Sequence, residues 1–199
     1  LGLGLFVSSG FYSPSVGDLK LLLYPIKLCE FYFFSGNPAD QLPADGVIQY
    51  SLNTPLYSDY AEKLRFIKLP EGTQASYKDK GVLSFPKGTV IIKTFYYPVD
   101  HRSPDKGRKL METRLLLHEE DGWKAVPYHW NEEQTEAYLE VAGVMKDVCW
   151  KDERGMKRKV NYVFPNMNQC KGCHSMGGEM TPIGPSAKQL NGALSYQEG

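Results

Sequence analysis

Long apolar runs and an excess of either charge are both missing from this sequence of 199 residues. The longest apolar stretch, Leu19 to Phe34, is interrupted by Pro25 and by charged residues, whereas a transmembrane helix needs about 20 mostly apolar residues. We therefore expect no transmembrane segment. The 23 basic and 23 acidic residues balance, and no basic block occurs, so we expect no nucleic-acid partner.

Cysteine is scarce as well, because the chain has four, and this excludes a disulfide-rich scaffold. Cys29 and Cys149 are far apart in the sequence. They form a disulfide only if the fold brings their Cα atoms within reach, and free thiols are the alternative. Cys170 and Cys173 lie together in the motif C-K-G-C-H, which is the strongest functional signal in the chain.

Aromatic residues, in contrast, make up 13% of the chain, which is typical of a β-rich core. Short β-prone segments separated by turn residues follow one another between residues 45 and 164. Pro86–Gly88 is a turn signal with one predicted strand before it and one after it, and Glu120–Gly122 and Asp152–Gly155 are hairpin signals. We predict a mainly β fold, with an antiparallel β-sheet domain at residues 45–164. Asn131 and Gln134 have the spacing of a helix cap, which predicts a short helix toward Leu139.

The two flanking segments differ from this domain. Residues 1–44 are expected to be an irregular lead-in, because Pro25 interrupts any helix there. Its first residues, LGLGLFVSSG, fit either the apolar tail of a signal peptide or an ordinary mature N-terminus. Residues 165–199 are rich in Gly, Pro, Asn and Met and poor in strand-forming residues. We predict that they form a short C-terminal cofactor-attachment segment.

Strand periodicity gives one lysine an unusual position. In TVIIKTFYY, successive side chains alternate between two faces, so Lys93 shares a face with Ile91 and Phe95. This pattern predicts either a functional amine beside a cofactor or a lysine whose ammonium group extends to water. Arg114 in METRLLL has two similar interpretations, as a bidentate partner of a carboxylate or as a plain surface charge.

The motif at Cys170–His174 has the spacing of covalent c-type haem attachment. Two thiols separated by two residues can each add to one vinyl group of haem, and the histidine that follows can ligate the iron. We therefore predict one covalent haem c, held by Cys170, Cys173 and His174, with His174 as the metal ligand. A protein of this kind works in redox chemistry outside the cytoplasm.

Three other interpretations of the motif stay open. A thioredoxin-like redox pair is expected near a βαβ pattern, which the sequence lacks. A structural zinc site needs four ligands, whereas the motif supplies at most three. The last alternative is a chance match of structural cysteines.

The residues around the motif offer partners for the iron and for His174. Gly184-Pro185 resembles the Gly-Pro pair of small soluble c-type cytochromes, whose proline carbonyl accepts a hydrogen bond from the proximal histidine. Pro185 is thus a candidate for orienting His174, and a simple loop turn is the alternative. Met176 and Met180 lie too near His174 in the sequence to be favoured as ligands on the opposite haem face. The sixth position is then open or filled by another residue.

Five segments together resemble a family of uncharacterised exported bacterial proteins. The resemblance covers most of residues 45–195 and rests on these stretches, in this order: NTPLYSDYAEKLRFIKLPEG, FPKGTVIIKTFYYP, METRLLL, DGWKAVPYHWNEEQTEA and NQCKGCHSMGGEMTPIGPSAKQLNG. It implies a periplasmic or extracellular bacterial single-haem c-type cytochrome, without an assigned reaction. Cys29 departs from the small polar residue expected there.

A more distant resemblance concerns the position of Lys93. FPKGTVIIK looks like the strand that bears the cross-linking lysine of the hydroxylamine-oxidising cytochromes, and DGWKAVPY resembles a later core strand of these proteins and of cytochrome c′-beta. In those antiparallel β proteins the haem packs against the sheet and its distal site is open. The resemblance implies that Lys93 is a candidate catalytic residue.

Two functions follow from these observations. The first is electron transfer by a monohaem c-type cytochrome that exchanges electrons with a redox partner protein. The second is a haem enzyme or gas-binding protein, in which the sixth position is open and Lys93 acts on the ligand. We predict the first, because electron transfer is the default role of an attached haem without a defined pocket, and the second is the alternative. The sequence leaves open whether the protein is an enzyme, and its oligomeric state.

Overall fold

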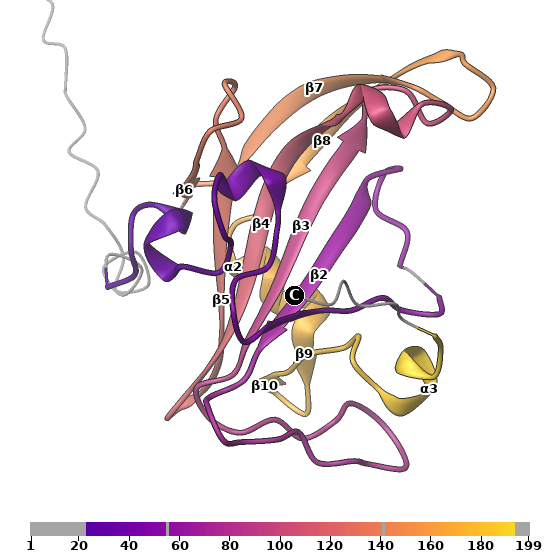
Figure 1. Ribbon diagram of the computed structural model, residues 1–199. Helices are drawn as coiled ribbons and strands as arrows, with labels where there is room; N and C mark the ends of the chain where they lie inside the picture. Colours follow the sequence, from indigo (N-terminus) through magenta and orange to yellow (C-terminus); the bar gives the residue numbers. More distant parts are fainter. Residues whose placement is uncertain (1–22, 55, 141, 194–199) are drawn as a thin grey trace, which may run out of the picture.

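The computed structural model describes residues 23–54, 56–140 and 142–193, and a six-stranded antiparallel sheet forms its centre (Figure 1). Each strand pairs with the next one along the chain. The strands are β1 (Val47–Gln49), β2 (Glu62–Lys68), β3 (Val90–Pro98), β4 (Arg108–Glu119), β5 (Gly122–Trp130) and β6 (Ala137–Leu139). The prediction of a mainly β, antiparallel fold is confirmed.

Alternation along the strands gives the sheet two different faces. The first, which we call the apolar face, carries side chains that are completely buried: Phe66, Ile92, Leu115, Val126 and Tyr128. The second, which we call the cavity face, carries a mixture of charged and apolar side chains: Arg65, Ile91, Lys93, Phe95, Tyr97, Glu112, Arg114 and Leu116. The predicted grouping of Lys93 with Ile91 and Phe95 is confirmed.

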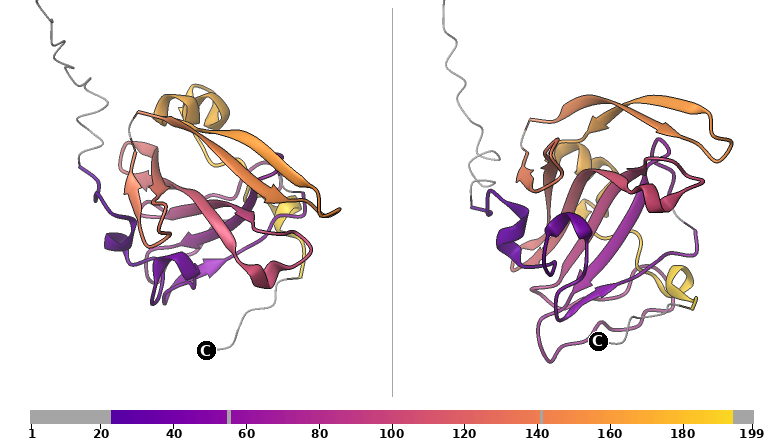
Figure 2. Two further views of the ribbon diagram at one scale, coloured as in Figure 1. Left: turned by 90° about the horizontal axis from the view of Figure 1, so that it is seen from above. Right: turned by 45° about the horizontal axis from the view of Figure 1, so that its top comes forward.

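The N-terminal segment covers the apolar face. It contains the 3-10 helices η1 (Leu28–Phe31) and η2 (Pro38–Asp40), and its Leu28 and Phe33 join the cluster of buried side chains on this face. The left view of Figure 2 places this indigo segment on one side of the sheet and helix α2 (Met167–His174) on the other. The expected lead-in thus supplies one layer of the core; its residues 1–22 lie outside the described part.

A separate two-stranded ribbon covers one half of the cavity face (Figure 2). It consists of β7 (Val144–Lys151) and β8 (Lys157–Phe164). Val148, Trp150, Tyr162 and Phe164 point from the ribbon into a second cluster, which includes Phe95, Tyr97 and Met111 of the sheet. The turn predicted at Asp152–Gly155 is confirmed, and the Asp152 carboxylate accepts hydrogen bonds from the backbone N–H groups of Arg154 and Met156.

The C-terminal segment covers the other half of this face. It contains α2, the short strands β9 (Ser175–Met176) and β10 (Glu179–Met180), and α3 (Ala187–Leu190). A third cluster joins Cys170 of this segment to Ile91, Leu116 and Ala125 of the sheet. A further 3-10 helix, η3 (Pro104–Lys106), precedes β4.

Two local predictions are wrong. The Asn131–Gln134 pattern does not cap a helix, because the Asn131 side chain accepts hydrogen bonds from the N–H groups of Thr135 and Glu136 and leads into β6. Short polar side chains stabilise such turns as readily as caps. The strand expected before Pro86 is reduced to isolated bridges at Val82 and Ser84.

The described residues contain no helix with the length and apolar character that crossing a membrane would require.

Candidate functional site

Helix α2 carries the C-K-G-C-H motif, and its start is fixed locally. The Asn166 side chain accepts a hydrogen bond from the Gln169 N–H at 3.0 Å, and the Gln169 side chain accepts one from the Asn166 N–H at 2.9 Å. This reciprocal pair is a capping box. Residues four apart share a helix face, so Cys170 and His174 both face the sheet, whereas Cys173 is exposed.

A cavity of about 370 Å³ lies between this segment and the cavity face of the sheet. Its lining brings Cys170 and His174 together with Lys93 and Arg114, although these residues are distant in the sequence. The remaining lining residues are Tyr50, Leu52, Thr54, Leu56, Tyr57, Arg65, Ile91, Leu115, Leu116, Ala125, Pro182, Ile183, Gly184, Pro185 and Gln189. This volume lies within the usual range for small-molecule and cofactor sites.

The loop before β2 closes the cavity against the C-terminal segment. The Asn53 amide donates hydrogen bonds to the carbonyls of Lys188 and Asn191 at 2.8 and 3.0 Å. The N–H of Thr54 donates to the Gln189 side chain at 2.9 Å. The wall at Leu52–Tyr57 is therefore attached to the segment that bears the motif.

The imidazole of His174 is held in one tautomer. Its Nδ1 lies 3.0 Å from the carbonyl oxygen of Thr181, and because a carbonyl can only accept, Nδ1 must carry the proton. Nε2 then presents its lone pair, which is the form that binds a metal. Burial lowers the pKa of His174, so the ring is neutral at neutral pH.

The predicted role of Pro185 therefore belongs to another residue. The carbonyl that orients His174 is that of Thr181, and the carbonyl of Pro185 accepts the N–H of Leu83 at 2.9 Å instead. The turn formed by β9 and β10 brings Thr181 back beside His174, which sequence spacing alone does not reveal. Pro185 is nevertheless part of the cavity wall.

Three cations form a row across the cavity face. Lys93 pairs in register with Arg65 of β2 and with Arg114 of β4, and all three line the cavity. Burial, followed by the charges of Arg114 and Arg65, lowers the pKa of Lys93 to about 8. Its ammonium nitrogen lies 5.0 Å from the centre of the Phe95 ring, within the range of a cation–π contact.

A buried carboxylate neutralises only one of these cations. Glu112 is completely buried, and its Oε2 accepts a hydrogen bond from Nε of Arg114 at 2.9 Å. The hydroxyl of Tyr162 donates to the same carboxylate. Among the described residues no carboxylate forms an ion pair with Arg65 or Lys93, so the cavity wall keeps an excess of positive charge that suits an anionic occupant.

The four cysteines differ in their surroundings. Burial raises the pKa of the Cys170 thiol, whereas Cys173 is exposed and does not line the cavity. Cys29 and Cys149 are both free, so the disulfide considered from the sequence does not form. Within the described residues, no group of three or more His, Cys, Asp and Glu side chains could hold a metal ion. Nothing in this part of the chain therefore supports the zinc alternative.

No family model, curated protein or solved structure matches the chain. The resemblances noted in the sequence thus stay predictions, and the chemistry of the site is argued from its own residues.

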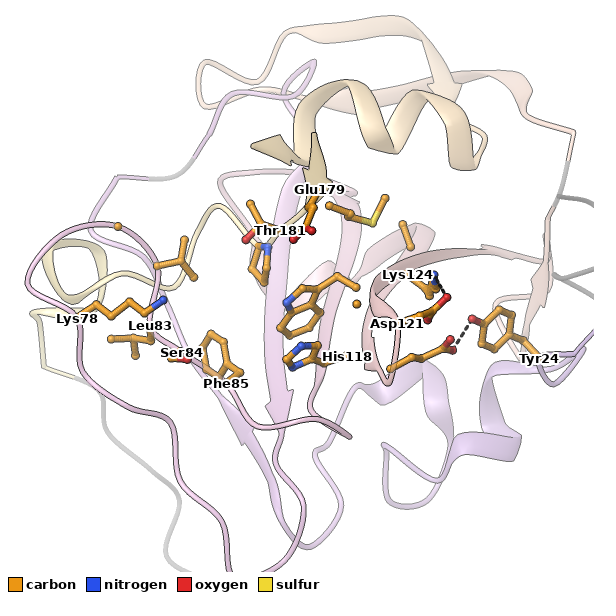
Figure 3. A pocket seen from close by; sticks show the side chains of 18 of the residues that line it. Tyr24, Lys78, Leu83, Ser84, Phe85, His118, Asp121, Lys124, Glu179 and Thr181 are labelled. Carbon is orange, nitrogen blue, oxygen red and sulfur yellow. Dashed lines mark hydrogen bonds and ion pairs between the residues drawn. The ribbon is translucent and has the colours of Figure 1, made fainter. Parts of the chain in front are cut away.

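A larger groove, of about 1080 Å³, lies next to the cavity (Figure 3). Its floor carries His118 stacked on Trp123, with ring centres 4.4 Å apart. Thr181 and Glu179 lie on one side of this pair in Figure 3, and Lys78 and Phe85 on another. Neither Cys170 nor His174 lines the groove, so its greater size does not make it the site of the motif's chemistry.

Several of these residues were not predicted from the sequence. Arg65 and Glu112 lie in ordinary strand patterns, and only the register of β2, β3 and β4 brings them to Lys93 and Arg114. A charged residue on an otherwise apolar strand face was the available signal. The signal that selects Lys93 also selects Glu112 in LMETRLLL.

Proposed function

We propose that this chain is a redox protein with one haem c, attached through Cys170 and Cys173 and ligated by His174, and that it works in the bacterial periplasm or outside the cell. The observation that carries the proposal is the shared cavity. It brings the metal-binding form of His174 and the thiol of Cys170 against a wall of cations, while Cys173 lies on the exposed side of α2.

The residues present fit such a group. Haem is flat and apolar with two carboxylates at one edge, so it suits a cavity with apolar walls and unpaired cations. Ile91 and Leu116 provide apolar surface. Arg65 and Lys93 provide charge for the carboxylates, while Arg114 is already paired with Glu112. Thr181 fixes the ring of His174 through Nδ1. The haem itself supplies one-electron chemistry at the iron.

The cavity lining favours an open sixth position. Among the described residues that line it, His174 is the one imidazole and no methionine is present. The amine of Lys93 lies on the sheet side of the cavity, and with a pKa of about 8 it is protonated at neutral pH and has no free lone pair for the iron. We therefore favour a haem protein that binds or converts a small ligand over an electron carrier with two strong axial ligands. Electron transfer, or turnover that consumes electrons, requires a redox partner protein.

Covalent attachment is tested with the Cys170→Ala/Cys173→Ala double variant, expressed with the maturation apparatus for c-type haem. We expect wild type to keep its pigment after denaturation and the double variant to lose it entirely. Cys149→Ala is the matched control, because Cys149 is exposed on β7, and this variant should keep the pigment. Pigment that survives denaturation in the double variant would refute the proposal.

The state of the sixth position is read from optical spectra of the reduced protein with and without carbon monoxide. An open site binds carbon monoxide, so we expect a high-spin spectrum that shifts on its addition. A sharp low-spin spectrum that carbon monoxide leaves unchanged would assign the protein to the electron carriers instead.

A further inference from the structure

A continuous row of oxidisable aromatic rings runs through the cluster beneath the β7–β8 ribbon. The ring centres of Tyr162 and Tyr97 are 6.0 Å apart, and those of Tyr97 and Trp150 are 4.8 Å apart. Trp150 is followed by Tyr60 at 5.8 Å, and Tyr60 by Tyr57 at 5.3 Å. Each spacing lies within the range of direct ring contact, so no gap interrupts the row.

The two ends of the row have opposite environments. Tyr162, Tyr97 and Trp150 are 3%, 1% and 5% exposed, whereas Tyr60 and Tyr57 are 63% and 66% exposed. The row therefore leads from the protein interior to its surface.

The inner end carries a proton acceptor. The Tyr162 hydroxyl donates to the buried carboxylate of Glu112, which Arg114 holds in place at the cavity wall. Burial and the charge of Glu112 raise the pKa of Tyr162, so the phenol keeps its proton in the resting protein. A phenol that loses an electron becomes a strong acid, and Glu112 is in position to take that proton.

We propose that Tyr162 is a redox-active tyrosine, with Glu112 as its proton acceptor and with Tyr97, Trp150, Tyr60 and Tyr57 as the path by which electrons reach it from the surface. The supply of an oxidant in the cavity rests on the proposed haem function. The aromatic path and the proton acceptor are properties of the chain itself.

The oxidant is a hydroperoxide, which takes up two electrons and two protons and breaks its O–O bond. The proposed haem, when reduced, would supply one electron, and Tyr162 supplies the other. The Tyr162 O–H bond breaks, and its proton passes to Glu112. The protons that the hydroperoxide consumes come from solvent and form water and an alcohol, or two waters from hydrogen peroxide. One electron from the redox partner protein, passed through Tyr57, Tyr60 and Trp150 and across the Tyr97 ring without oxidising it, restores Tyr162, which recovers its proton from Glu112.

Tyr128 provides a matched comparison on the apolar face. It is also completely buried, but its hydroxyl donates to the carbonyl of Pro25 at 2.8 Å. A carbonyl is a far weaker base than a carboxylate, so it cannot take the proton of an oxidised phenol. Tyr128 should therefore resist oxidation under conditions that oxidise Tyr162.

The test uses the full chain without haem and a soluble photogenerated oxidant, tris(bipyridine)ruthenium(III), so that it does not depend on the proposed function. High-field EPR of frozen samples, in ordinary and heavy water, identifies a tyrosyl radical with an exchangeable hydrogen bond. We expect this signal in wild type and in Tyr128→Phe, and its loss in Tyr162→Phe. Circular dichroism checks that each variant is folded.

Two further variants test the acceptor and the path. Glu112→Gln should lower the yield of the hydrogen-bonded radical about tenfold, the factor that corresponds to one charge-assisted hydrogen bond. Trp150→Phe should abolish the Tyr162 signal and leave radicals at the exposed tyrosines. An undiminished signal in Tyr162→Phe, or no such signal in wild type, would overturn the proposal. An unchanged Tyr162 signal in Trp150→Phe would overturn the path.

The same samples with attached haem, reduced and treated with hydrogen peroxide, separate the two proposals. If haem attaches, we expect the same EPR signal from Tyr162, and its absence there would overturn the step that hydroperoxide drives. If no haem attaches but the photochemical signal is present, the proposed function fails and the redox-active tyrosine stands.

Discussion

The two faces of the central sheet use the same strands for different purposes. Ile92 and Ile91 are consecutive residues of β3, yet Ile92 is enclosed in the apolar face and Ile91 borders the cavity. The apolar face contains closely packed side chains under the N-terminal segment. The cavity face holds a row of cations, a buried carboxylate and a void. Stability is thus concentrated on one face, and the groups available for chemistry on the other.

The largest change in the free energy of unfolding is expected from the pair of substitutions Ile92→Ala and Ile91→Ala. Truncating Ile92 opens a new hole in a filled cluster, so it should lower the free energy of unfolding by about 2–5 kcal/mol. Truncating Ile91 enlarges a space that already exists, so the loss should be smaller by about 1 kcal/mol or more. Denaturant unfolding of the haem-free chain measures both. Equal losses would mean that the cavity face is packed as tightly as the apolar face.

The second prediction concerns the charge on the cavity face. The pKa of Lys93 falls from 10.5 in an ordinary lysine to about 8. Below pH 8 the amine is protonated in both the folded and the unfolded chain, and burying that charge lowers stability by up to about 3 kcal/mol. Between these two pKa values the unfolded chain binds more protons, so stability should rise with pH.

Lys93→Met removes this group. At neutral pH the haem-free variant should be more stable than wild type, and the difference should shrink as the pH rises from 8 toward 10.5. Unfolding curves at several pH values check this. Lys124→Met is a control, because Lys124 forms a surface ion pair with Asp121 at 2.7 Å, and its effect should stay small across the same range. A difference in stability between Lys93→Met and wild type that does not change with pH would contradict the burial of the Lys93 charge.

The smallest effect is expected at a polar group within the apolar face. The Thr113 hydroxyl accepts a hydrogen bond from Nε1 of Trp130 at 3.0 Å and lies 2.8 Å from the hydroxyl of Thr94. Thr113→Val leaves the buried indole N–H without an acceptor, which should cost about 1–3 kcal/mol. Thr94→Val keeps that acceptor and should cost less. If the two substitutions have the same effect in denaturant unfolding, the indole hydrogen bond contributes nothing of its own.

Local sequence patterns predicted much of the fold. Alternation in TVIIKTFYY correctly placed Lys93 on one face with Ile91 and Phe95, because a strand's side-chain period is independent of its neighbours. The turn at Asp152–Gly155 was predictable because its signal also lies in consecutive residues. The Asn131 pattern failed because an Asx-type turn and a helix cap use the same side-chain hydrogen bonds.

The site was predictable only in part. The spacing of Cys170, Cys173 and His174 selected these residues as candidates, and the structure places Cys170 and His174, but not Cys173, at the cavity. The partner of His174 was not predictable, because a turn of unknown shape decides whether the carbonyl of Thr181 or of Pro185 reaches it. The pairing of Arg114 and Tyr162 with Glu112 depends on the register of β3 and β4 and on the position of the ribbon.

The link between His174 and Thr181 is reciprocal: the Thr181 N–H donates to the His174 carbonyl at 2.7 Å, and the His174 ring donates to the Thr181 carbonyl. So short a loop closes at little entropic cost, and it uses no strand of the large sheet. The orientation of the ring is therefore set by a few consecutive residues and does not depend on the strands of the large sheet. Substitutions in the sheet would therefore alter the cavity wall opposite His174 without changing which imidazole nitrogen faces that wall.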